Sequence, residues 1–460
     1  MQAFVKSGFS EDLRALIRVG WPLILNNLFS IGVNVADTLM VGRLGATQLA
    51  ALSIGSSLWI GIFLGGLGIL MALGPTVAQH FGAGREADIG HDTGQAIWLA
   101  LAISCVVIVV MHAVDPLLVW LQIDPEVRLL AVTYLHALAY GVPGVYLYHV
   151  LRQMNEGIGR TVPIMVVTGI ALVINVVLSY CFIFGKHGAP GLGVIGSAVG
   201  SSMSFWCLFA MLALYMWWHP YYARFHFWTD VAIPDRKSIR RLLSLGGPIG
   251  VSLMMQAGLF TGLALMMGSL GSTYAAAHQI SLNYAGLVFM VPLGLAFATA
   301  VLVGQAIGRA APREARRIGM VGIGVCLVLA TTVGVVTYFC APLIARVYTH
   351  DPAVVALASS LLTISAILQI GDGTQSAAAG ALRGLKDTRV PMLINGGIYW
   401  GIGFTTAYGL GVVLNWQAQG IWCALALALW VAAVTLTLRF RYIVSCHIAA
   451  LGPAAQFNNP

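Results

Sequence analysis

The chain has 460 residues, of which 59% are hydrophobic and 9% are charged, whereas soluble domains contain roughly 45–50% apolar and 25% charged residues. This composition excludes a water-soluble globular protein. The formal net charge of +8 would suit a nucleic-acid partner, so the places where the basic residues lie decide whether one is expected.

Charge-poor stretches recur along the chain from Leu16 to Arg439. A helix needs about 20 apolar residues to cross the core of a bilayer, and breaks at charged or Pro/Gly-rich clusters separate segments of about that length. The sequence therefore predicts an all-α polytopic membrane protein embedded in the lipid bilayer. Its twelve predicted transmembrane helices are 14–42, 51–81, 93–113, 128–149, 162–184, 193–218, 240–268, 275–307, 318–341, 354–381, 391–412 and 420–438.

Polar side chains interrupt the first span. Ser30, Asn34 and Asp37 follow the i, i+4, i+7 spacing of one helical face. Acidic residues are costly inside lipid and usually mark ion or proton pathways. We expect this face to look into the protein or into a wet cavity. The alternative is an interfacial carboxylate, because Arg43 follows Asp37 by six residues.

The basic residues fall mainly on one side of the predicted helices. With a cytoplasmic N-terminus, 20 of the 24 Lys and Arg residues lie on the cytoplasmic side. The remaining four are Arg43, Arg128, Lys186 and Arg346. The positive-inside rule then predicts that both termini are cytoplasmic. The positive charge reflects topology, and we expect no nucleic-acid partner.

An internal repeat divides the chain. At an offset of 226 residues, 20–82 aligns with 246–308 without a gap, and the identities include Gly20/Gly246, Pro22/Pro248 and Gly68/Gly294. Because 226 residues cover six predicted spans, both halves enter the membrane in the same sense. We predict an N-lobe at 1–218, a cytoplasmic linker at 219–239 and a C-lobe at 240–460, so that two pseudo-symmetric six-helix lobes result.

A second acid lies inside a predicted span. Asp372 precedes Arg383 by eleven residues, which places it roughly 16 Å inside the membrane at about 1.5 Å per residue. An Asp at that depth costs about 2.5–3.5 kcal/mol on insertion. Gln369 lies on the same helix face. An ion-coupling role is the main hypothesis, with a structurally satisfied carboxyl group as the alternative.

Motifs for other energy sources and for catalysis are missing. The only Gly-Lys pair, Gly185–Lys186, has Tyr180 where a nucleotide-binding loop needs Gly. Neither H-E-x-x-H nor G-x-S-x-G occurs. We therefore expect a secondary transporter driven by an ion gradient, not an enzyme, with no cofactor besides its coupling ion.

Several motifs resemble those of the multidrug and toxin extrusion (MATE) family, most closely its NorM branch. They are Asn34-Val-Ala-Asp37-Thr-Leu-Met-Val-Gly-Arg43 with Pro22 upstream, Ala276-Ala-His278-Gln279-Ile280, and Gln369-Ile-Gly-Asp372-Gly-Thr-Gln375. The resemblance implies a bacterial inner-membrane antiporter that functions as a monomer. It would exchange H⁺ or Na⁺ for amphiphilic, often cationic drugs through a central cavity between the lobes.

By the same resemblance, Asp37 is the N-lobe coupling residue, with Asn175 as its hydrogen-bond partner, and Asp372 is the C-lobe carboxylate. The residues expected at the substrate cavity or the helix bend are Pro22, Asn34, Ser179, Ser201, Gln256, Gln279 and Gln369.

One position departs from the family pattern. NorM-like sequences usually have a glutamate where this chain has Gln256. An amide supplies only a dipole, whereas hard cations prefer anionic oxygen ligands. This favours H⁺ coupling through Asp37, although a Na⁺ site near Asp37 or Asp372 stays open.

Two rival functions follow from the same helices. A flippase for lipid-linked saccharides would want basic residues in its cavity, and all 24 Lys and Arg residues are expected beside loops or termini. A membrane-embedded enzyme or channel is disfavoured by the missing motifs and by the two-lobe repeat.

Overall fold

The computed structural model describes residues 8–186, 188, 190–225 and 233–450. Within these ranges the chain is helical and contains no β-strand. The predicted all-α membrane architecture is confirmed. Residues 226–232 of the predicted linker lie outside the described ranges.

The first repeat begins with α1 (Phe9–Gly42) and ends at a short 3₁₀ helix, η1 (Pro220–Phe225). The elements between them are α2 (Ala46–Leu70), α3 (Leu73–Gly82), α4 (Glu86–His112), α5 (Asp115–Trp120), α6 (Pro125–Ala139), α7 (Val142–Gly157), α8 (Val162–Phe184) and α9 (Val194–Trp218).

The second repeat begins with α10 (Arg236–Leu270) and ends with α16 (Gln417–Ala450). Between them lie α11 (Ser272–Gly308), α12 (Pro312–Tyr348), α13 (Pro352–Gly384), α14 (Arg389–Gly396), η2 (Gly397–Phe404), α15 (Thr405–Tyr408) and η3 (Gly409–Val413), of which η2 and η3 are π-helical.

Most predicted spans correspond to a single long helix. In the described part of the chain, ten helices are long and apolar enough to cross a membrane, and eleven if the bent pair α6 and α7 counts as one span. That pair bends by 50° beside Pro143 at the start of α7, which has no backbone N–H to continue the hydrogen bonds of α6. The predicted span 391–412 is the mixed α/π segment from α14 to η3. Glycines at 396, 397, 401, 403, 409 and 411 weaken regular helical winding there.

The helices form two compact units, which divide the chain within helices α1 and α10. One unit contains residues 25–250, and the other contains residues 1–24 together with 251–460. The first half of each leading helix is therefore grouped with the other repeat. The predicted lobe limits at 218/219 and 239/240 stay a prediction.

Glycines at equivalent positions of the two repeats lie where the first halves of α1 and α10 contact another helix of the same compact unit. In the 25–250 unit, a Cβ on Gly246 would stand 2.0 Å from the carbonyl oxygen of Ile69, and one on Gly68 would stand 2.3 Å from Cα of Gly250. In the other unit, a Cβ on Gly294 would stand 2.8 Å from the backbone nitrogen of Ile24. Only glycine lets the backbones approach this closely, as in other tightly packed membrane helices.

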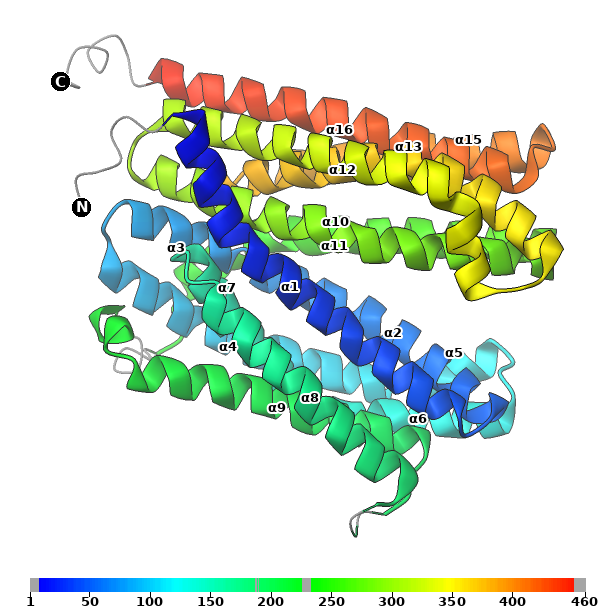
Figure 1. The fold of residues 1–460 in the computed structure, drawn as a ribbon. Helices are drawn as coiled ribbons and strands as arrows, with labels where there is room; N and C mark the ends of the chain where they lie inside the picture. The colour runs from blue at the N-terminus through cyan, green and yellow to red at the C-terminus, as the bar shows by residue number, and fades with distance from the viewer. Residues whose placement is uncertain (1–7, 187, 189, 226–232, 451–460) are drawn as a thin grey trace. The chain divides into compact units, whose positions relative to one another are not determined.

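Each unit has its own apolar core. In the 25–250 unit, one buried cluster runs through α2, α4, α6, α7 and α9 and includes the fully buried side chains of Tyr146 and Leu135. In the other unit, α11, α12, α13 and α16 pack side by side (Figure 1), and Leu16, Val19 and Leu23 of α1 complete one of its two clusters. These cores fix the helices that carry the acidic residues.

Candidate functional site

Asp37 lies in the second half of α1 and is buried, with 7% of its surface exposed. The Ser201 hydroxyl of α9 donates a 3.1 Å hydrogen bond to its Oδ2 atom. The Asn175 amide of α8 donates in turn to Ser201 Oγ at 3.1 Å. The structure thus brings three of the predicted site residues together, although Asn175 reaches the carboxylate only through Ser201.

Three buried oxygens of this cluster lack a hydrogen-bond partner of full geometry among the described residues: Asp37 Oδ1, Asn175 Oδ1 and Ser179 Oγ. Ser179 lies beside the Asp37 carboxylate. Buried polar atoms are normally paired, so a set of unpaired oxygens around one acid is available to bind a further group. It can accept a proton or face a cation.

Close packing of α8 against α9 positions the cluster. A Cβ on Gly200 would stand 2.8 Å from both the backbone nitrogen and Oγ of Ser179. Glycine at this point allows α9 to carry Ser201, one residue later, up to the carboxylate. The site therefore depends on a glycine as well as on its polar residues.

Asn34 does not join this cluster. Ser30 and Asn34 are exposed, and each donates to a backbone carbonyl of its own helix, Ser30 to Asn26 at 2.9 Å and Asn34 to Ser30 at 3.4 Å. The expected polar face of the first helix is therefore split. Asp37 is buried within its unit, whereas the other two side chains are not.

A second polar network lies nearer the start of the same unit. Thr168 of α8 donates to Asn26 Oδ1 at 2.7 Å, and the hydroxyls of Tyr148 and Thr168 are 2.8 Å apart. Asn26 has a signal in the sequence, because it is a polar residue in an otherwise apolar helix. Thr168 and Tyr148 carry no comparable signal, because single polar residues are common in membrane helices.

A buried ion pair corrects two expectations. Arg152 and Glu156 both lie inside α7, their side chains 10% and 3% exposed, and they are 2.6 Å apart. The expectation that every Lys and Arg lies beside a loop is therefore wrong, as is the predicted end of this span. Helix α7 continues to Gly157, past the predicted limit of 149. Because Glu156 compensates Arg152, this charge does not create an anion site.

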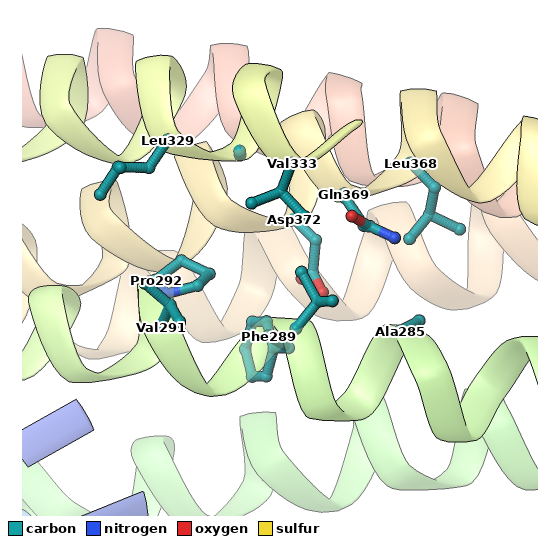
Figure 2. A pocket seen from close by; sticks show the side chains of 11 residues that line it. Ala285, Phe289, Val291, Pro292, Leu329, Val333, Leu368, Gln369 and Asp372 are labelled. Carbon is teal, nitrogen blue, oxygen red and sulfur yellow. The ribbon is translucent and has the colours of Figure 1, made fainter. Parts of the chain in front are cut away.

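Asp372 lies in the middle of α13 and is also buried. It borders a cavity of about 60 Å³ whose wall is otherwise apolar except for Gln369, with Phe289 and Pro292 from α11 and Val333 from α12 (Figure 2). Asp372 Oδ1 and Gln369 Oε1 have no hydrogen-bond partner in the described part of the chain. A water needs about 10–15 Å³ by this measure. The cavity can hold an ion with a few waters, but not a drug-sized molecule.

The other predicted residues lie apart from this cavity. Gln256 is half-buried on α10, Gln279 is exposed on α11, and neither borders the cavity beside Asp372. Pro22 is buried inside the continuous helix α1. It leaves one backbone hydrogen bond of that helix unmade, two residues before the division between the compact units.

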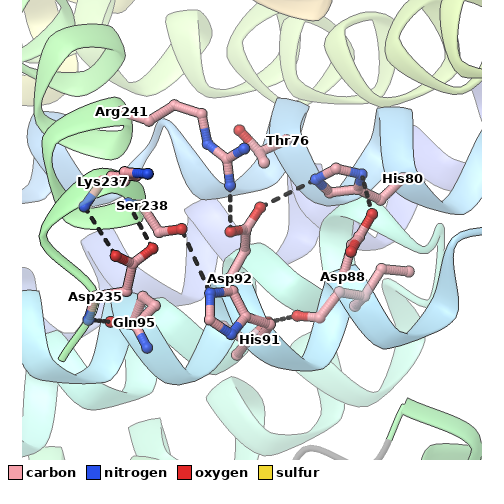
Figure 3. Close-up of polar contacts among 12 residues, drawn as sticks. Thr76, His80, Asp88, His91, Asp92, Gln95, Asp235, Lys237, Ser238 and Arg241 are labelled. Carbon is pink, nitrogen blue, oxygen red and sulfur yellow. Dashed lines mark hydrogen bonds and ion pairs between the residues drawn. The ribbon is translucent and has the colours of Figure 1, made fainter. Parts of the chain in front are cut away.

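Charged and polar groups connect the start of α10 to α4 through ion pairs and hydrogen bonds (Figure 3). Asp92 is almost fully buried and accepts from Arg241 at 2.5 Å and from His80 at 3.0 Å. Gln95 accepts from the backbone N–H of Asp235 at 2.7 Å. The described end of the predicted linker is therefore hydrogen-bonded to a helix of the 25–250 unit. This contact could not be predicted from local sequence patterns, since its partners are about 140 residues apart.

Asp235 also caps α10. Its carboxylate accepts from the backbone N–H groups of Lys237 and Ser238 at 3.0 and 3.1 Å. These hydrogen bonds, with that of Lys237 foremost, hold the pKa of Asp235 below its usual value.

The chain has a duplicated sequence and helices that can cross a membrane. Each of its two compact units buries a carboxylate that has no ion-pair partner among the described residues. Together these features define a membrane transporter. The MatE family profile matches residues 22–181 and 248–408, one match in each half of the repeat. The chain belongs to the MATE family. It is accordingly a secondary transporter and not an enzyme.

Known relatives cover nearly the whole chain. It is 35% identical over 437 residues to the multidrug resistance protein MdtK of Yersinia pestis (strain Pestoides F), covering 94% of this chain and 96% of that protein. It is 39% identical over 435 residues to the probable multidrug resistance protein NorM of Xanthomonas axonopodis pv. citri (strain 306), covering 94% and 95%. The helices and these bacterial relatives make it a multi-pass protein of the bacterial inner membrane.

The fold is shared with solved structures. The crystal structure of the eukaryotic MATE transporter AtDTX14 matches with a TM-score of 0.87 at 20% identity, covering 96% of this chain and 99% of that one. At this identity the similarity shows the fold alone.

Proposed function

We propose that this protein is a cation-coupled antiporter that exports amphiphilic, often cationic compounds, and that H⁺ at Asp37 is the coupling ion. The observation that carries the proposal is the buried Asp37 carboxylate with one oxygen bound by Ser201 and the other unpaired. No Lys, Arg or His within the described ranges forms an ion pair with it.

An uncompensated carboxylate inside a membrane protein is unfavourable. Insertion scales place the cost near 2.5–3.5 kcal/mol for a helix centre, and a proton removes the charge while leaving the hydrogen bond from Ser201 in place. Deprotonation restores the charge and the cost. Gain and loss of a proton can therefore shift the preference of α1 between two arrangements, as coupled transport requires.

Bending of α1 near Pro22 is the conformational change that we assign to this switch. The proline leaves a backbone carbonyl unpaired, which lowers the cost of a bend. Asp37 lies fifteen residues further along the same helix, so a change in its packing acts on the bend directly. In this proposal the protonated form releases drug on the outside, and loss of the proton inside resets the helix.

Coupling to H⁺ is favoured over Na⁺ by the donor set. Each buried cluster contains one carboxylate, and the position where a second is usual is the amide of Gln256. Sodium prefers several oxygen ligands with anionic character, whereas a proton needs one basic oxygen. Asp372, with its small cavity, is proposed as a second cation site of the other unit.

The substrate and the topology are inferred from other observations. The relatives named above are multidrug resistance proteins, which supports a range of lipophilic substrates. The distribution of 20 and 4 basic residues supports cytoplasmic termini. Each half of the chain can bury its own core, which supports a functional monomer.

The test uses proteoliposomes loaded with a fluorescent amphiphilic cation, with pH and Na⁺ gradients imposed separately. We expect the pH gradient to drive transport and Asp37→Asn to lower the rate at least about tenfold, because about 1.4 kcal/mol of lost coupling has that effect. Glu126→Gln is the matched control, since it makes the same change at an exposed acid of α6. Transport driven by Na⁺ alone, or unchanged by Asp37→Asn, would refute coupling by H⁺ at Asp37.

A second variant separates the two ions. Gln256→Glu restores the carboxylate that the family pattern contains, and we expect it to add Na⁺ dependence to the transport. Wild-type protein that already depends on Na⁺, with no change in the variant, contradicts the assignment.

A further inference from the structure

A long apolar groove lies between the first half of α1 and α12. Both belong to the unit of residues 1–24 and 251–460. The groove holds about 810 Å³. Its wall is mainly apolar and includes Phe9, Leu13, Ile17 and Trp21 of α1 and Gly324 of α12, and Arg317 is its one charged residue.

The groove is long enough to hold an acyl chain of one bilayer leaflet. The fifteen helical steps from Phe9 to Ile24 cover roughly 22 Å at 1.5 Å each, whereas half of the hydrocarbon core is about 15 Å thick. Gly324 keeps the middle of the groove open, since a Cβ there would meet no atom within 4 Å. An extended acyl chain fits this shape. Without such a chain, most of the wall of the groove would face water or lipid without a fixed partner.

Positive charge lies at one side of the groove. Arg14 and Arg18 are exposed, one turn apart on α1, and border an adjoining hollow of about 510 Å³ that shares Leu13, Ile17 and Trp21 with the groove. Neither arginine forms an ion pair within the described ranges, and the neighbouring acid Glu11 is paired with neither.

Arg317 is already compensated. Its guanidinium is 2.5 Å from Asp12, which is almost fully buried. The net charge offered to a ligand therefore comes from Arg14 and Arg18. Two uncompensated guanidinium groups repel an amphiphilic cation and attract a phosphate group, with which arginine forms strong paired hydrogen bonds.

We propose that this groove is a binding site for an anionic phospholipid of the leaflet on the N-terminal side. One acyl chain lies between α1 and α12, and the phosphate group contacts Arg14 and Arg18. A zwitterionic lipid carries its own compensating cation and gains less from these arginines. Basic pockets beside transmembrane helices recognise anionic head groups by the same balance. The bound lipid ties the first half of α1 to α12, and so stabilises this unit.

Native mass spectrometry of the purified full-length protein tests the site. Phosphatidylglycerol and phosphatidylcholine with the same acyl chains are titrated in parallel. We expect the first phosphatidylglycerol to bind at least about tenfold more tightly, since each arginine beside a head group of net negative charge contributes about a factor of five. Arg14→Gln with Arg18→Gln should reduce its affinity to that of phosphatidylcholine.

Arg313→Gln with Arg316→Gln is the matched control, because both arginines are exposed at the start of α12 and lie outside the groove. It should retain the preference for phosphatidylglycerol. Equal affinity of the two lipids for the wild-type protein, or an equal loss in the control, overturns the proposal.

Two further measurements keep the test independent of charge. Gly324→Leu should fill the groove and weaken phosphatidylglycerol binding, whereas Gly61→Leu, at an equally open position of α2, should not. Phosphatidylglycerol with brominated acyl chains should quench the tryptophan fluorescence less in Trp21→Phe than in the wild type. Unchanged binding in Gly324→Leu, unchanged quenching in Trp21→Phe, or displacement of the lipid by a fluorescent amphiphilic cation at equal concentration contradicts an acyl-chain site here.

Discussion

Replacing Gly246 by alanine should destabilise the 25–250 unit, because α10 passes α2 there without room for a side chain. The added Cβ would stand 2.0 Å from the carbonyl oxygen of Ile69 and 2.7 Å from its carbonyl carbon and Cα. These are backbone atoms, so no rotamer change relieves the clash and a helix must move by about 1 Å in a close-packed interior.

The net effect follows from two opposed contributions. Overpacking costs about 1–3 kcal/mol, and a clash with backbone lies toward the upper end of that range. Alanine recovers up to about 1 kcal/mol of helix propensity relative to glycine. We expect a net loss of about 2 kcal/mol, which is about thirtyfold in the ratio of folded to unfolded protein.

The neighbouring glycine supplies the control. A Cβ on Gly247 would meet no atom within 4 Å, so Gly247→Ala should leave stability unchanged or raise it by up to about 1 kcal/mol. Gly20→Ala, at the equivalent position of the repeat, should lie between the two, because its contact at 2.9 Å is with the tip of the Leu295 side chain.

Unfolding by SDS in mixed micelles, followed by circular dichroism, gives the free energies for this comparison. Equal stability of Gly246→Ala and Gly247→Ala would show that the repeat glycines do not mark backbone contacts. The close crossing of α2 and α10 would then be incorrect.

Two further predictions concern groups away from the carboxylate sites. Arg152→Met should lower stability by about 3–5 kcal/mol, because it leaves Glu156 buried without its partner. The double variant with Glu156→Met should regain most of this loss in the same unfolding assay. A single variant as stable as the wild type contradicts the ion pair. Asp235 stabilises the start of α10 while it is ionised, because hydrogen bonds lower its pKa in the folded state. This stabilisation is present above the unfolded pKa of Asp235, which is about 4. It is lost as the pH falls through the lower pKa of the folded state. Hydrogen exchange at the amides of Lys237 and Ser238, corrected for intrinsic rates, should show protection at pH 5 that decreases toward pH 2, and Asp235→Asn should show no such decrease.

The sequence by itself determined the membrane class, the helices and the duplication. Apolar runs of about 20 residues can be satisfied only by helices in lipid, so composition and spacing sufficed to place most spans within a few residues. It also singled out Asp37 and Asp372, since a carboxylate within an apolar run is costly wherever the helix packs. The family followed from motifs that span both halves.

Only the tertiary structure decided what surrounds each acid. Asp37 and Ser201 are 164 residues apart in the chain, and their hydrogen bond depends on the glycine contact between α8 and α9. The exposure of Asn34 and the burial of Arg152 against Glu156 could not be read from helical periodicity, because the hydrophobic pattern of a membrane helix barely distinguishes lipid from protein neighbours. The partners of a buried polar group are fixed by how helices pack, and a single sequence records the packing only where glycine or proline makes it necessary.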